Sequence, residues 1–255
     1  MTDAFNPTAR LVKTILSLAG VLLIWWAISA IGIVNPELFP SPYGVLIAGS
    51  ELYREGLLYA DLKVSLGRAA VGFTVGATLG VVAGLLTART RTFNWALNPL
   101  LTLLRPIPAI ALVPVAIVWF GIGEGSKYFV ISYTVFLAVW LNTHHGMEQL
   151  PQTYLRASRS LGATRLREFV EVVIPASAPH IVAGLRIGAA LAFLSLVAAE
   201  LTGASAGIGY RLQEARQFIR IDRMFVGLVE LGVLGALLDY FFVVISRKLI
   251  HWEQA

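Results

Sequence analysis

The residues of this sequence that could do chemistry are few, and none has the spacing of an enzyme site. No G-x-x-x-x-G-K-[ST] phosphate loop occurs, and the stretch GIGEGSK at residues 121–127 predicts only a tight turn. The four histidines form no H-E-x-x-H pair, and no cysteine is present to complete a zinc site. We therefore expect no metal, no cofactor and no enzymatic activity in this chain alone.

Five ionisable residues fall where a membrane would surround them, and charge at that depth usually has a function. For three of them we favour an interfacial charge or a polar contact between helices: Arg186, Glu230 and Asp239. For Arg105 and Glu200 the sequence leaves open such a contact or a place in a translocation pathway. The tentative pathway residues are Arg105, Pro106, Pro108 and Glu200.

Residues 154–175 read as a short helical hairpin. Gly162 can adopt a positive φ that ends a first helix, and Pro175 is expected to end a second one. An apolar stripe at spacings of 3, 4 and 7 runs along the second helix through Leu166, Phe169, Val170 and Val173. Such an amphipathic hairpin is suited to docking onto another protein, with a solvated loop as the plainer alternative.

The elements that position these residues are predicted membrane helices. The chain is 57% hydrophobic and 14% charged, against about 25% charged residues in soluble domains. We predict an all-α integral membrane protein, a single domain over residues 1–255. Its six spans are expected at residues 14–34, 69–88, 96–121, 128–146, 180–201 and 225–245, with a loop at 148–178. The first run is too long for the core of a cleaved signal peptide, so we interpret it as an anchor.

Two of these spans carry a distinctive pattern. Gly72, Gly76, Gly80 and Gly84 recur every fourth residue, which favours close packing of a neighbouring helix over a lining role in a pathway. Residues 92–120 would be about 43 Å long as one helix, more than the ~30 Å hydrocarbon core. This region must therefore project beyond the membrane or break near the prolines 106 and 108. Between the first two spans, Ser41 and Pro42 predict the start of a short amphipathic helix over about residues 43–54.

Lysine and arginine gather in the loops that a cytoplasmic N-terminus would place inside, which predicts that both termini are cytoplasmic. One loop disagrees, because Arg211, Arg216, Arg220 and Arg223 would then lie outside. The net charge of +5 is modest and reflects topology rather than nucleic-acid binding.

The hairpin resembles the cytoplasmic EAA loop of ABC importer permeases, E-A-A-x3-G-x9-I-x-L-P. Gly and Pro match at the required spacing, while Arg156 stands at the glutamate and Ser158 at the second alanine. The residues that the resemblance assigns to contact with an ATPase are Arg156, Ala157, Ser158, Gly162, Ala163, Val172, Ile174 and Pro175.

Further stretches are similar to the subfamily that imports nitrate, sulfonates, taurine and bicarbonate. They are LFPSP at 38–42, SLGR at 65–68 with GF at 72–73, RPIP at 105–108, WFGIGEGSK at 119–127, GLR at 184–186, AAE at 198–200 and GIG at 207–209. Each is weak alone, but their order and spacing along the chain make the match specific.

This resemblance implies a permease of the bacterial inner membrane that works as a homodimer within the lipid. Separate cytoplasmic ATP-binding subunits would bind and hydrolyse ATP, and a periplasmic solute-binding protein would deliver a small anion or an organic sulfonate or carboxylate. The alternatives are a stand-alone secondary transporter or channel, which often shows paired broken helices, and a membrane scaffold without transport. Only one broken region is visible in the sequence, and a scaffold leaves Arg105 and Glu200 without a role.

Overall fold

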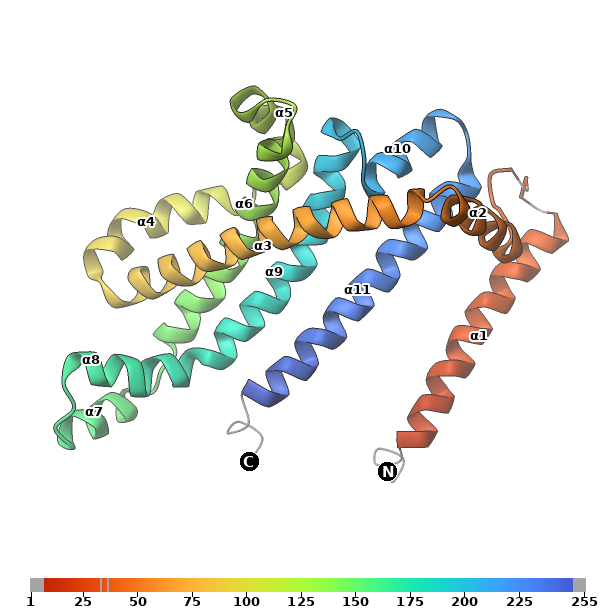
Figure 1. The fold of residues 1–255 in the computed structure, drawn as a ribbon. Coiled ribbons are helices and arrows are strands. Elements are labelled where there is room, and N and C mark those ends of the chain that lie inside the picture. The colour runs from red at the N-terminus through yellow and green to blue at the C-terminus, as the bar shows by residue number, and fades with distance from the viewer. Residues whose placement is uncertain (1–6, 33, 36, 250–255) are drawn as a thin grey trace. The chain divides into compact units, whose positions relative to one another are not determined.

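The structure is a computed structural model of the 255-residue chain and describes residues 7–32, 34–35 and 37–249. Within these ranges it is helical from α1 to α11, with one π-helical segment and no strand (Figure 1). The predicted all-α class is therefore confirmed. Residue 33 of the first predicted span, and the extreme termini that we expect in the cytoplasm, lie outside the described residues. Contacts divide the chain into two compact units, Met1–Ala60 with Arg211–Glu230, and Asp61–Tyr210 with Leu231–Ala255.

The first unit contains the apolar helix α1 (Pro7–Ile31) and the short helix α2 (Pro42–Arg54). The Ser41 hydroxyl caps α2 by accepting a hydrogen bond from the Gly44 N–H, and Pro42 occupies the first turn as predicted. The inner face of α2 forms a small core with the beginning of α11 (Ile221–Leu249), made of Val45, Ala48, Leu52 and Val226. The predicted amphipathic helix is thus confirmed, and its apolar face is the buried one.

The same unit explains the arginines that disagreed with the charge-based topology. Arg220 pairs with Glu51 at 3.3 Å and Asp222 at 2.8 Å, and Arg223 pairs with Glu55 at 2.8 Å. The hydrogen bond with Asp222 raises the pKa of Arg220. Acidic side chains of this unit therefore pair with two of the four arginines that disagree with the predicted topology, and the orientation of the chain stays a prediction.

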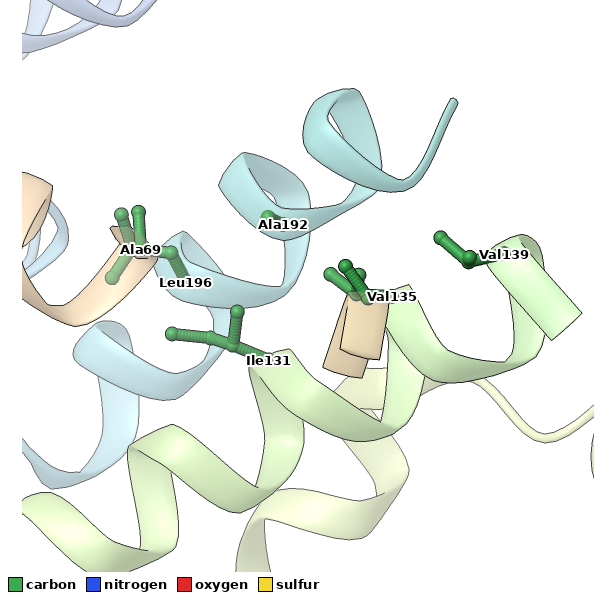
Figure 2. Packing of buried hydrophobic residues seen from close by; sticks show 7 residues of the cluster. Ala69, Ile131, Val135, Val139, Ala192 and Leu196 are labelled. Carbon is green, nitrogen blue, oxygen red and sulfur yellow. The ribbon is translucent and has the colours of Figure 1, made fainter. Parts of the chain in front are cut away.

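In the second unit, α3 (Leu57–Arg89), α6 (Glu124–Glu148) and α9 (Ile174–Gly203) pack around one apolar cluster. Figure 2 labels six of its members, namely Ala69, Ile131, Val135, Val139, Ala192 and Leu196. The predicted glycine face of α3 lies against α6: a β-carbon at Gly80 would be 2.8 Å from Cβ of Val139 and 2.9 Å from the Phe136 carbonyl oxygen. The glycines therefore serve close helix packing, as we favoured.

The region between α3 and α6 is broken. Helix α4 (Arg91–Leu104) and helix α5 (Ala109–Phe120) meet at a bend of 106°, so residues 96–121 are not one continuous helix. The break falls at the predicted prolines, because Pro106 and Pro108 lack the N–H groups that would continue α4. The Tyr133 hydroxyl of α6 donates to the Leu104 carbonyl at 2.7 Å and satisfies the end of α4.

The helices also begin and end at other residues than hydropathy alone predicts. α3 starts at Leu57 rather than residue 69, and three polar residues of the additional turns, Asp61, Ser65 and Arg68, are buried against partners described below. The chain ends with α10 (Ile208–Gln217) and α11 (Ile221–Leu249). Among the described helices, four are long and apolar enough to cross a membrane, or five if α4 and α5 form one broken span. α6 is not among them, so the division into six spans stays a prediction.

Candidate functional site

The predicted docking hairpin is formed by α7 (Gln152–Ser160) and α8 (Arg165–Glu168). Gly162 connects them with φ of 80°, a left-handed conformation that favours glycine, as the sequence predicted. The Thr164 hydroxyl then caps α8 by accepting from the Arg167 N–H at 3.3 Å. The tight turn between two short helices fixes the direction in which the hairpin points.

Glu168 braces this hairpin from within. Its carboxylate accepts hydrogen bonds from Arg159 Nε at 2.7 Å and Nη2 at 3.1 Å, and from the Ser158 hydroxyl at 3.4 Å. Glu168 is buried, and the ion pair raises the pKa of Arg159. Arg89, at the end of α3, lies 3.8 Å away. The bidentate pair between Arg159 and Glu168 links α7 to α8, and the contact with Arg89 links the hairpin to α3.

Sequence reasoning missed Glu168. The available signal was Ser158, which replaces an alanine of the family motif and is buried against Glu168. A hydroxyl at a position that the family fills with alanine indicates a polar partner nearby, but the motif alone does not identify that partner.

The predicted proline stop is wrong. After α8 the chain passes through the π-helical turn Phe169–Val173 and continues directly into α9, with Pro175 in the first turn of that helix. The wider π turn accommodates a proline, which cannot donate the next backbone hydrogen bond. The hairpin is thus continuous with a long apolar helix.

The π turn also splits the predicted apolar stripe. Val173 is buried, whereas Leu166 is 73% exposed and Val170 53% exposed. Leu161, beside Gly162, is 88% exposed. Of the residues assigned by resemblance, Arg156, Ala157 and Gly162 are exposed, Ser158 is buried, and Ala163, Val172, Ile174 and Pro175 are half-buried. The hairpin therefore presents apolar and arginine side chains outward around a braced interior.

A second polar cluster, centred on Arg68, joins α3, α6 and α9 in their halves away from the hairpin. Arg68 of α3 donates to Glu200 of α9 at 2.8 Å and, through two nitrogens, to Glu124 of α6 at 2.7 Å each. The Ser65 hydroxyl donates to Glu200 at 2.8 Å. The hydrogen bond from Arg68 lowers the pKa of Glu124, which precedes the predicted span at 128–146, to about 2.

The backbone at residues 206–209 closes this cluster. Arg68 also donates to the Ala206 carbonyl at 2.6 Å, while the N–H groups of Gly207, Ile208 and Gly209 donate to Asp61, Ser65 and Glu200. Four of the stretches singled out in the sequence, SLGR, GIGEGSK, AAE and GIG, therefore meet at one site. The structure uses GIGEGSK as a turn and helix start, and Lys127 donates to the Gly123 carbonyl at 3.0 Å.

The tentative pathway residues do not all lie together. Arg105 and Pro108 line a cavity of about 720 Å³ between the α4–α5 break, α6 and α9. Pro106 is exposed beside it, whereas Glu200 is buried in the Arg68 cluster. Arg186 and Asp239 form an ion pair at 2.7 Å between α9 and α11, which is the polar contact that we favoured for them. A role of Arg105, Pro106, Pro108 and Glu200 in transport stays a prediction.

The fold and the site define a polytopic α-helical membrane protein with a bent, apolar helix pair, α4 and α5, and a hairpin braced by an ion pair. The chain belongs to the family of binding-protein-dependent transport system inner membrane components, which it matches over residues 76–251. This confirms the resemblance to ABC importer permeases.

Individual relatives agree over nearly the whole chain. It is 35% identical to the putative aliphatic sulfonates transport permease protein SsuC of Bacillus subtilis, over 95% of this chain and 88% of that protein. It is 32% identical to the taurine transport system permease protein TauC of Escherichia coli, over 97% and 92%. It is also 32% identical to the nitrate import permease protein NrtB of Synechocystis, over 98% and 94%.

A solved structure supports the fold. An inward-facing structure of the MetNI methionine ABC transporter matches with a TM-score of 0.63, at 20% identity, over 72% of this chain and 92% of the matched chain. The likeness at this identity concerns the fold alone.

Proposed function

We propose that this chain forms, with a second copy of itself, the translocation pathway of an ATP-driven importer for a small anion, most specifically an organic sulfonate. Two of the relatives named above are permeases for sulfonates or taurine, and a third for nitrate, and these solutes share a single anionic head. A solute-binding protein would deliver the anion from the periplasm. Selectivity would then rest largely with that protein.

The observation that carries the coupling part of this proposal is the hairpin braced by Arg159 and Glu168. A hairpin that transmits force must be stiff, and a bidentate ion pair from Arg159 to the buried Glu168 carboxylate, between two short helices, provides stiffness. Leu161 and Leu166 point outward from it and offer apolar anchors for a groove on a partner. We propose that the partner is a separate ATP-binding subunit on the cytoplasmic side, so that both termini of this chain face the cytoplasm.

The separate roles of the two subunits follow from the same hairpin. ATP would be bound and hydrolysed by the partner, and this chain would convert the partner's closure into a change of the pathway. The continuity of α8, the π turn and α9 supports this, since a displaced hairpin moves the helix that flanks the cavity.

The test reconstitutes the chain with its cognate ATP-binding subunit and binding protein in vesicles. The chain alone should hydrolyse no ATP, and activity should appear only when the ATP-binding subunit is added. Gly162→Asp should abolish uptake while membrane insertion is retained, because it adds a charge at a left-handed position of the exposed turn.

Gly162→Asn is the matched control for that variant. Asparagine tolerates the left-handed conformation and adds no charge, and the turn has open space for a side chain. It should retain most of the uptake. Normal uptake by Gly162→Asp, or hydrolysis by the isolated chain, would contradict the proposal.

A further inference from the structure

The cavity beside the α4–α5 break contains one charged side chain among the described residues that line it, Arg105. The guanidinium is exposed, and no acidic residue in the described part of the chain pairs with it. By contrast, Arg68, Arg159, Arg186, Arg220 and Arg223 all have carboxylate partners. Arg105 is therefore a cation whose five donors are available to a ligand.

The position of Arg105 makes this availability unusual. α4 has 14 residues and α5 has 12, so they are about 21 Å and 18 Å long and neither alone crosses a ~30 Å hydrocarbon core. Together they are apolar enough for a broken span or a re-entrant loop, and in either arrangement the break between them lies within the membrane. Irregular backbone and an unpaired charge are tolerated there only where they face water or a polar ligand.

The walls of the cavity complement a single charge. Most of the lining side chains are apolar, among them Leu137, Leu141, Ile187, Leu191 and Leu194. The polar lining residues besides Arg105 are Tyr133, Thr134, Asn142 and Ser195, and the Asn142 amide donates to the Ala138 carbonyl. The hydroxyls of Tyr133, Thr134 and Ser195 already donate to backbone carbonyls. A ligand that satisfies both Arg105 and these walls has one anionic head and an apolar stem.

We infer that Arg105 is the anion-binding residue of a transport cavity for organic anions, in which the guanidinium holds the oxyanion head and the leucine-lined wall holds the aliphatic part. This inference rests on the proposed function and deepens it, because it assigns part of the anion preference to the permease itself. A planar guanidinium suits an oxyanion, since two parallel N–H groups can donate to two oxygens.

The sequence provides a clean test, because the chain has no cysteine. Ala138→Cys, on the cavity wall, places one thiol in the full-length chain in phosphatidylcholine nanodiscs. The thiol is labelled with a methanethiosulfonate reagent that carries a sulfonate and with one that carries a trimethylammonium group. With Arg105 present, the sulfonate reagent should react faster, and Arg105→Gln should lower the ratio of the two rates at least about tenfold.

Two further variants make that result interpretable. Arg105→Lys keeps the charge and should keep most of the preference. Arg91→Gln removes an exposed arginine outside the cavity lining and should leave the ratio unchanged. An unchanged ratio in Arg105→Gln, or an equal loss in Arg91→Gln, would overturn the inference.

Added sulfonates that protect the introduced thiol from labelling identify the ligand of the cavity. Hexanesulfonate should slow labelling of the introduced thiol at lower concentration than methanesulfonate, and neither should protect in the Arg105→Gln background. Equal protection by the two sulfonates would refute the apolar part of the site. If only added phosphatidylglycerol protects, Arg105 binds a lipid headgroup and the inference fails. The labelling needs no ATP-binding subunit, so its failure leaves the coupling proposal standing, and the reverse also holds.

Discussion

Arg68 in α3 donates a hydrogen bond from Nη1 to Oε1 of Glu200 in α9 at 2.8 Å, and both side chains are buried. The same guanidinium holds Glu124 at the start of α6. One arginine thus connects three helices that form the core of the second unit. The sequence offered Glu200 as a pathway residue. In the structure both of its carboxylate oxygens accept hydrogen bonds within this cluster.

Removal of Arg68 should destabilise the protein strongly. Arg68→Ala leaves Glu200 buried without its cation, and loss of one partner of a buried ion pair costs about 3–5 kcal/mol. The unfolding temperature in detergent should fall by at least about 6 °C. Arg167→Ala is the control, because Arg167 and Glu171 form an exposed pair that contributes about 0–1 kcal/mol. Similar melting of the two variants would contradict the assigned role of the cluster.

The ion pair between Arg159 and Glu168 predicts that a variant can lose coupling to ATP hydrolysis without losing the fold. Glu168→Gln should reduce ATP-dependent uptake severalfold and speed tryptic cleavage at Arg159 and Arg165, because the neutral amide loses the ion pair with Arg159. Glu171→Gln alters only an exposed pair with Arg167 and should behave as wild type in both measurements. If Glu168→Gln retains full uptake, stiffness of the hairpin is not what coupling requires.

Glycine packing between α3 and α6 can be tested with two identical substitutions. Gly80→Ala forces a methyl group against Val139 and Phe136 and should cost about 1–3 kcal/mol of stability. Gly67→Ala, in the same helix, meets nothing within 4 Å and should be neutral or stabilise the helix by up to about 1 kcal/mol. Thermal unfolding of both variants in the same detergent decides the matter, and equal effects would rule out close packing as the role of the glycine face.

The Glu124–Arg68 pair predicts an acid-dependent loss of stability. The pKa of Glu124 is lowered from 4.5 to about 2 in the folded protein, so its charge stabilises the fold above pH 4.5. That contribution should decrease as the pH falls from about 4.5 to about 2. The difference in unfolding temperature between wild type and Glu124→Gln should be constant from pH 7 to 5 and shrink below pH 4.5. A difference that already shrinks between pH 7 and 5 would assign the effect to another group.

The sequence by itself determined the features that depend on local composition and spacing. Apolar runs predicted the long helices, because a helix in lipid must expose apolar side chains over about 20 residues. The four-residue glycine spacing predicted the packed face of α3, and Gly162 predicted the turn of the hairpin, since both depend on helix periodicity or on one residue's φ. The prolines after Arg105 located the break, though not its angle of 106°.

Only the tertiary structure decided which polar residues meet. Arg68, Glu124 and Glu200 are far apart in the chain, and no periodicity connects them, so their pairing depends on how α3, α6 and α9 pack. The π turn that carries the chain past Pro175, and the burial of Glu168 against Arg159, likewise depend on backbone geometry and neighbours that spacing does not encode. The reason is physical: a hydrogen bond requires donor and acceptor to lie within about 3 Å, and for distant segments only the packed fold sets that distance.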